Sequence, residues 1–186
     1  MKILITGGAG FIGSNLASRL ISENHSVWVL DNLLTGNKKN IESLTSNKNF
    51  TFIQGDVAAP ETIQQLSNVA FDNVFHLASP ASPVQYIKYP LETLRVNTEG
   101  TRLLLEYVKE NPATKILFAS TSEVYGDPLE HPQKETYWGN VNSFGPRSCY
   151  DEAKRFGEAL CYSYQHLLNL DIRIVRIFNT YGPNME

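Results

Sequence analysis

The chain has 186 residues, enough for one domain with a sizeable core but not for two full domains. Apolar residues make up 42% of it and charged residues 19%, a composition of globular proteins that excludes extensive disorder. Sixteen basic and nineteen acidic residues give a net charge of −3 without a basic stripe, so we expect no nucleic-acid partner.

The sequence also bears on the compartment. No apolar run approaches the ~20 residues that cross a bilayer, so we expect no membrane association. The chain opens directly on a strand-like segment without a signal-peptide pattern, which favours a cytoplasmic protein. Cys149 and Cys161 have no metal-ligand spacing and fall in one predicted helix, so we expect no metal site and two buried reduced thiols.

Six short segments rich in β-branched and aromatic residues alternate with helical patterns. The predicted strands are residues 2–6, 27–31, 50–55, 73–78, 115–120 and 172–178. The predicted helices are residues 11–23, 60–68, 91–110 and 149–169. This order predicts an α/β fold with a doubly wound parallel sheet of the Rossmann type.

Two stretches break the alternation. Residues 32–49 predict a surface loop with one helical turn. Residues 126–147 contain three prolines and predict a long loop, of a length that is usually functional or disordered. Residues 179–186 leave no room for a separate substrate domain after the sixth strand, so we treat residues 1–186 as one unit.

A glycine-rich turn follows the first strand and opens the first helix. Its glycines have the spacing G-x-x-G-x-x-G, which lets backbone N–H groups approach a pyrophosphate at the positive end of the helix dipole. Such a turn can also be merely structural, but a strand before it and a helix after it favour a dinucleotide site. The predicted cradle comprises Gly7, Gly10, Phe11, Ile12 and Gly13.

Acidic residues follow the second and third strands. Asp31 lies 18 residues beyond Gly13, where a carboxylate accepts hydrogen bonds from an adenosine ribose and repels a 2′-phosphate. We therefore expect NAD rather than NADP, with Asn32 beside it; the alternative for Asp31 is a loop cap. Asp56 and Val57 are predicted to meet the adenine amine and ring, and the alternative there is a plain turn.

A tyrosine and a lysine four residues apart form the second constellation. Tyr150 and Lys154 share one face of a predicted helix. Because a free phenol has a pKa near ~10, we expect the lysine ammonium to lower the pKa of Tyr150 and prepare it as a base. A hydroxyl in the segment Ser120 to Ser122 is positioned to bind the same substrate oxygen. The alternative is a surface pair without a catalytic role.

These motifs together resemble the extended short-chain dehydrogenase/reductase superfamily, which contains nucleotide-sugar epimerases, dehydratases and decarboxylases. The resemblance rests on residues 6–14 (TGGAGFIGS), 76–78 (HLA), Asn97 in NTEGT, Tyr150 with Lys154, and 176–183 (RIFNTYGP), and it covers essentially the whole chain. It implies further cofactor contacts from Leu77, Ala78, Ser79, Asn97 and Ser120, and substrate contacts from Pro80, Ala81, Tyr86, Thr121 and Asn179.

Within that superfamily, four stretches resemble the UDP-glucuronate decarboxylase (UDP-xylose synthase) family most closely. They are residues 76–83 (HLASPASP), 121–128 (TSEVYGDP), 137–142 (YWGNVN) and 145–152 (GPRSCYDE). The triplet Thr121 to Glu123 discriminates best, because related dTDP-glucose 4,6-dehydratases carry an Asp-Glu pair after the threonine and this chain has Ser122 in place of the aspartate. The alternatives are a 4,6-dehydratase, a UDP-sugar 4-epimerase, or a non-catalytic NAD-binding sensor.

The resemblance implies a mechanism with a 4-keto intermediate. Tyr150 takes the proton of the sugar C4 hydroxyl while NAD accepts the C4 hydride, with Thr121 and Lys154 as supporting groups. Glu123 and Arg147 then manage the carboxylate and the reprotonation at C5. The resemblance also implies that most of the C-terminal nucleotide-sugar domain is absent from this chain. Finally, apolar stripes on helices 91–110 and 149–169 favour a homodimer, unless they face the sheet.

Overall fold

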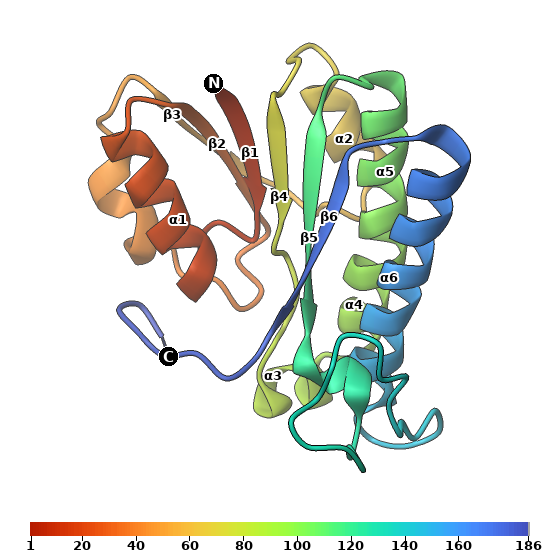
Figure 1. Ribbon diagram of the computed structural model, residues 1–186. Coiled ribbons are helices and arrows are strands. Elements are labelled where there is room, and N and C mark those ends of the chain that lie inside the picture. Colours follow the sequence, from red (N-terminus) through yellow and green to blue (C-terminus); the bar gives the residue numbers. More distant parts are fainter. Residues whose placement is uncertain (186) are drawn as a thin grey trace.

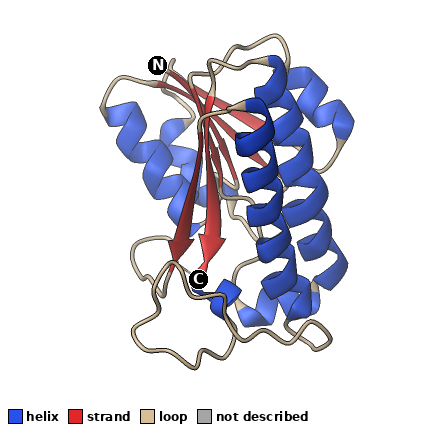
Figure 2. Cartoon of the chain, turned by 45° about the vertical axis from the view of Figure 1, so that its right-hand side comes forward, coloured by secondary structure: helices blue, strands red, loops and turns tan. Residues whose placement is uncertain are grey.

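The computed structural model describes residues 1–185, which form a sheet of six parallel strands with helices on both faces (Figures 1 and 2). The strand order is β3-β2-β1-β4-β5-β6, so the chain winds outward twice from a central β1. The predicted doubly wound Rossmann-type sheet is therefore confirmed. The strands are β1 Lys2–Thr6, β2 Ser26–Asp31, β3 Phe50–Gln54, β4 Asn73–His76, β5 Lys115–Thr121 and β6 Ile172–Ile177.

The helices divide between the two faces. Helix α1 lies on one face, and α2, α5 and α6 cover the other (Figure 1). The α-helices are α1 Phe11–Ser22, α2 Pro60–Leu66, α3 Pro83–Lys88, α4 Pro90–Arg95, α5 Thr101–Glu110 and α6 Ser148–Leu168. Shorter turns are the 3-10 segments η1 Lys38–Leu44 and η3 Ser122–Tyr125 and the π-helical turn η2 Val96–Gly100. No helix within residues 1–185 combines the length and apolar character needed to cross a membrane.

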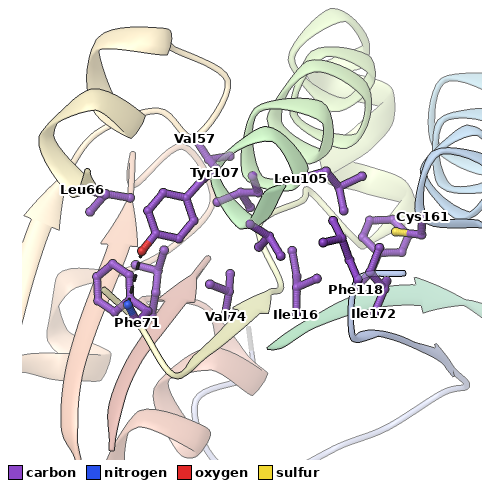
Figure 3. Close-up of a cluster of buried hydrophobic side chains, with 14 of the residues drawn as sticks. Val57, Leu66, Phe71, Val74, Leu105, Tyr107, Ile116, Phe118, Cys161 and Ile172 are labelled. Carbon is purple, nitrogen blue, oxygen red and sulfur yellow. Dashed lines mark hydrogen bonds between the residues drawn. The ribbon is translucent and has the colours of Figure 1, made fainter. Parts of the chain in front are cut away.

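Alternate residues of each strand feed two separate cores. Ile3 and Ile5 of β1 pack with Ala17 of α1, whereas Leu4 between them points into the opposite core. That second core joins β4 and β5 to α2, α5 and α6 (Figure 3). Strands buried on both faces need apolar residues at successive positions, which explains the continuous apolar runs in the sequence.

Tyr107 of α5 places a polar group in the second core without leaving it unpaired. Its hydroxyl donates to the carbonyl of Val69 at 2.6 Å and accepts the N–H of Phe71 at 3.3 Å (Figure 3). Burying a phenol costs the fold little stability when the hydroxyl both donates and accepts a hydrogen bond. The contact fixes α5 to the loop that leads into β4.

Two helix predictions need correction. The single helix predicted over residues 91–110 is divided into α4, η2 and α5, because a π-helical turn centred near Asn97 interrupts the α-helical hydrogen bonding. Helix α3 was not predicted, although Ser82 caps it by accepting the N–H of Gln85 and Pro83 occupies its first position.

Other expectations hold. The helical turn expected within residues 32–49 is η1. Residues 126–147 form a loop without helix or strand, in which Gly126 and Asn140 make one isolated bridge. Cys149 and Cys161 are both buried free thiols on α6, as expected.

Candidate active site

One cavity of about 580 Å³ opens where β1, β2, β4 and β5 end. Ligands of doubly wound sheets bind at this edge, next to the point where the strand order reverses, which here lies between β1 and β4. With the single exception of Asn97, every residue that the sequence analysis assigned to cofactor, substrate or chemistry lines this cavity. The structure thus brings the predicted residues together; which group of a ligand each one contacts stays a prediction.

The glycine-rich turn has no room for side chains. Gly7 adopts φ +72°, and a Cβ there would lie 2.7 Å from the backbone N of Ala78. A Cβ on Gly13 would lie 2.3 Å from the carbonyl oxygen of Gly7. Helix α1 therefore begins in close contact with the end of β1. Gly10 caps α1 without a side-chain hydrogen bond, so the first N–H groups of the helix remain available to a phosphate.

Asp31 caps a loop and also lies in the cavity wall. Its carboxylate caps the adjoining loops by accepting the N–H of Ala9 at 2.9 Å and that of Leu33 at 2.8 Å. It also lines the cavity, and each oxygen keeps a second lone pair for a ribose hydroxyl. Burial raises the pKa of Asp31, and the two backbone N–H groups oppose that rise.

Asp56 likewise belongs to a turn and to the cavity wall. One of its oxygens accepts the N–H of Ala58 at 2.9 Å, and the other lies 3.3 Å from the guanidinium of Arg95. Val57 is 3% exposed and contributes an apolar surface to the same wall. Residues 56 and 57 thus form a turn and also line the cavity, and their contact with adenine stays a prediction.

Tyr150 lies in an aromatic and hydroxyl environment. It is 5% exposed, its hydroxyl is hydrogen bonded to the Thr121 side chain, and its ring stacks on Tyr86 with centroids 4.8 Å apart and planes at 6°. Burial raises the pKa of Tyr150, while the Thr121 hydrogen bond opposes the rise. The expectation that Lys154 lowers the pKa of Tyr150 is wrong for this state of the protein.

The position of Lys154 explains that correction. Its Nζ donates to the carbonyl of Ala119 at 2.7 Å and lies 5.8 Å from the centroid of the Tyr150 ring. Lys154 is buried, and this burial lowers its pKa to about 7. A lysine that is only partly charged near neutral pH, and that is bonded to the end of β5, does little to stabilise a phenolate.

Asn97 is the one predicted cofactor residue that the structure does not bring to the cavity. It is fully buried on η2, where its side-chain amide donates to the Ser79 hydroxyl at 2.9 Å and to the Thr93 carbonyl at 2.8 Å. Ser79 itself lines the cavity. Asn97 is therefore linked to the cavity wall through Ser79, and its contact with a cofactor stays a prediction.

Two acidic side chains escaped the sequence analysis. Arg147 contacts Glu123, and its Nε also lies 3.8 Å from the buried carboxylate of Asp151. Glu158 accepts the Ser120 hydroxyl at 2.6 Å and forms a double hydrogen bond with Arg176. Spacing offered a signal for Asp151, which follows Arg147 by four residues. It offered none for Glu158, whose partners lie on β5 and β6.

Comparison with known proteins gives a consistent picture. A family model described as GDP-mannose 4,6 dehydratase matches residues 4–186. UDP-glucuronic acid decarboxylase 1 of Xenopus tropicalis is 50% identical over 185 residues, covering 100% of this chain and 42% of that protein. UDP-glucuronic acid decarboxylase 3 of Arabidopsis thaliana is 50% identical over 187 residues, covering 100% and 53%. The chain thus spans about half the length of these curated relatives.

Solved structures share the fold over the same range. A UDP-glucose 4-epimerase of Thermotoga maritima, solved with UDP-glucose, superposes with a TM-score of 0.87 at 31% identity. A dTDP-glucose 4,6-dehydratase of Streptomyces venezuelae, solved with NAD and TYD bound, superposes with 0.87 at 28% identity. In each case 100% of this chain aligns with 58% of the solved chain.

Proposed function

Because this chain belongs to the GDP-mannose 4,6 dehydratase family, we propose that it carries the cofactor-binding and acid–base residues of an NAD-dependent decarboxylation of UDP-glucuronate to UDP-xylose. Relatives that are 50% identical over the whole chain are UDP-glucuronic acid decarboxylases. The observation that carries the proposal is the contact between Glu123 and Arg147 on the wall of the cavity that also contains Tyr150. This contact places an acid, Glu123, and a cation that can bind a carboxylate, Arg147, in the same cavity as the candidate base Tyr150.

The cavity fits NAD by its shape and donors. A cradle that a Cβ on Gly7 or Gly13 would fill suits a pyrophosphate, and an acid at the end of β2 suits an unphosphorylated ribose. When bound, this cofactor supplies a reversible acceptor for hydride. The other steps belong to the side chains of this chain.

Tyr150 and Thr121 hold the oxygen at the reacting carbon. Tyr150 accepts the proton of the C4 hydroxyl, and Thr121, already hydrogen bonded to the phenol, orients the same oxygen. Since burial disfavours the phenolate, the reaction needs additional positive charge near Tyr150. Lys154 supplies it by moving from the Ala119 carbonyl toward the ring, 5.8 Å away.

Arg147 and Glu123 act at the carboxyl end of the sugar. Arg147 binds the substrate carboxylate until oxidation at C4 makes it a β-keto acid, whose CO2 departs because the carbonyl accepts the electrons. Glu123 then governs the return of a proton to C5. Ser122 supports this assignment over a dehydration, because it leaves the triplet with one carboxylate.

The proposal is tested by incubating NAD+ and UDP-glucuronate with purified protein extended through the C-terminal part that the relatives possess, and following CO2 and UDP-xylose. We expect both products in equal amounts. Formation of UDP-galacturonate without CO2 would instead identify a 4-epimerase. The variant Tyr150→Phe should retain NAD binding and lose turnover by roughly 10²–10⁴-fold, the usual contribution of a positioned acid–base group. Equal turnover by this variant contradicts the acid–base assignment.

A further inference from the structure

Arg147 lies between two carboxylates that differ in their surroundings. On one side it contacts Glu123 of η3, which lines the cavity. On the other side its Nε lies 3.8 Å from Oδ2 of Asp151, which is 6% exposed and, among the described residues, is not part of the cavity wall. Arg147 itself reaches the cavity. One guanidinium therefore joins a reactive-site acid to a buried one.

The buried carboxylate of Asp151 can accept a further hydrogen bond. Within residues 1–185, Oδ1 of Asp151 has no hydrogen-bond partner although it is inaccessible to solvent. Leaving a buried acceptor unsatisfied destabilises the fold, so a second arrangement that fills it is favoured. A carboxylate and a guanidinium can form two parallel hydrogen bonds, and the long contact at 3.8 Å uses neither fully.

Arg147 is the cation that acts on the charge of Asp151. Burial raises the pKa of Asp151, and Arg147 is the group that opposes the rise. The guanidinium lies within ion-pair distance of the carboxylate, with Nε 3.8 Å from Oδ2.

The two acids reach Arg147 from different elements. Asp151 lies in the first turn of the 21-residue helix α6, and its backbone N–H donates to the Arg147 carbonyl at 3.0 Å. Glu123 lies in a four-residue 3-10 turn at the cavity wall. The backbone of Asp151 is thus tied to that of Arg147, whereas Glu123 contacts the same guanidinium from a separate segment of the chain.

We propose that Asp151 is a positioning residue that anchors Arg147 when Glu123 leaves it. In this exchange, Arg147 gives up Glu123 and forms a paired contact with both oxygens of Asp151, while a remaining N–H group binds the sugar carboxylate. The binding of the sugar carboxylate by Arg147 rests on the proposed function, whereas the anchoring of Arg147 by Asp151 does not. Asp151 thereby lets Glu123 act on a proton without releasing the arginine that binds the substrate.

The anchoring is tested in the substrate-free protein by the rate at which phenylglyoxal modifies Arg147, followed by peptide mass spectrometry. Glu123→Gln should leave Arg147 protected, because Asp151 takes over. Glu123→Gln combined with Asp151→Asn should raise the rate by at least about fivefold, a coupling expected when either acid suffices. The matched control combines Glu123→Gln with Glu152→Gln, which removes a neighbouring acid that faces Arg155, and should leave the rate unchanged. Equal rates in both double variants overturn the anchor.

The substrate role is tested separately. Asp151→Asn should raise KM for UDP-glucuronate by about tenfold, the loss of roughly one charged hydrogen bond, with a smaller change in kcat. The affinities for NAD and for UDP-glucose should stay within about twofold, since neither ligand carries the sugar carboxylate that Arg147 binds. Glu152→Gln should resemble the wild type. A wild type that neither binds nor converts UDP-glucuronate refutes the proposed function, while the labelling experiment still decides the anchor.

Discussion

Burial controls the ionisation of the polar side chains that surround Tyr150. His76, at the end of β4, is hydrogen bonded to Thr6 at 2.7 Å and to Thr101 at 3.1 Å, and burial lowers its pKa to about 3. Lys154 is buried nearby, with a pKa lowered to about 7. Both groups thus favour their neutral forms more than they do in water, and this has a measurable dependence on pH.

Stability should rise with pH between about 7 and 10 because of Lys154. In this range the unfolded chain holds the lysine proton, because the usual pKa of lysine is 10.5, and the folded chain has largely lost it. The free energy of unfolding therefore increases with pH. Lys154→Met removes this dependence. Urea unfolding of both proteins at pH 7 and pH 9.5 measures the difference. The control Lys109→Met, at an exposed ammonium paired with Glu106, should keep the wild-type slope.

The reverse applies to His76 on the acid side. The folded chain keeps this histidine neutral down to about pH 3, whereas the unfolded chain binds a proton below its usual value of 6.5. The stability contributed by His76 is therefore complete above that value and is lost as the pH falls through this window. A variant His76→Gln should lose less stability between pH 7 and pH 5 than the wild type does, as urea unfolding at both values would measure.

At the level of single residues, the sequence indicates which side chains gather but not their charge states. The spacing of Tyr150 and Lys154 predicts a shared face, and both line the cavity. The rise in the pKa of Tyr150 follows from its 5% exposure and its stacking on Tyr86, which come from α3 packing against α6. Packing between segments that are distant in the chain leaves no local pattern in the sequence.

Between elements, the contact of α6 with β5 depends on one glycine. A Cβ on Gly157 would lie 2.4 Å from Cζ of Phe118, whose ring is fully buried. Gly157→Ala should therefore destabilise the protein by about 1–3 kcal/mol through overpacking, despite the better helix propensity of alanine. Urea unfolding measures the effect. Adding Phe118→Leu should return part of the loss, and strictly additive losses would contradict the steric explanation.

The helices also mark where reading the sequence succeeds and where it does not. The predicted bounds of α1, α2 and α6 differ from the observed ones by two residues or fewer, because each has an apolar stripe of helical period. The turn η2 keeps nearly the same period, so residues 91–110 resemble one helix. Helix α3 has only six residues, too few to display a period at all.

On the scale of the whole molecule, apolar side chains remain exposed where α4 packs against α6. Leu91 is 74% exposed and Phe156 49% exposed. Exposed apolar side chains on two helices that pack together favour association, so we expect a homodimer through these helices. Light scattering after size exclusion should show twice the chain mass, and Leu91→Glu with Phe156→Glu should halve it. Leu129→Glu, at an exposed site of the long loop, serves as the control. A wild-type monomer at all concentrations contradicts this expectation.

At this scale the doubly wound parallel sheet was predictable from the alternation of elements together with the glycine-rich turn. Right-handed crossovers between parallel strands restrict the possible topologies to a few, and the glycine-rich turn after the first strand selects the doubly wound one. The cavity then follows, since all six strands end at the same edge. Links such as that of Glu158 with Ser120 depend on side-chain lengths across three elements and could not be anticipated.

The central position of β1 in the sheet determines when its two neighbouring strands can pair with it during synthesis. This strand leaves the ribosome first, and β2 and β3 can assemble on one flank of it without delay. Its other flank waits for β4, whose His76 meets Thr6 only after 70 further residues have been translated. Nascent intermediates therefore carry an apolar inner strand with one unpaired flank until β4 emerges, a stage at which chaperones can protect it.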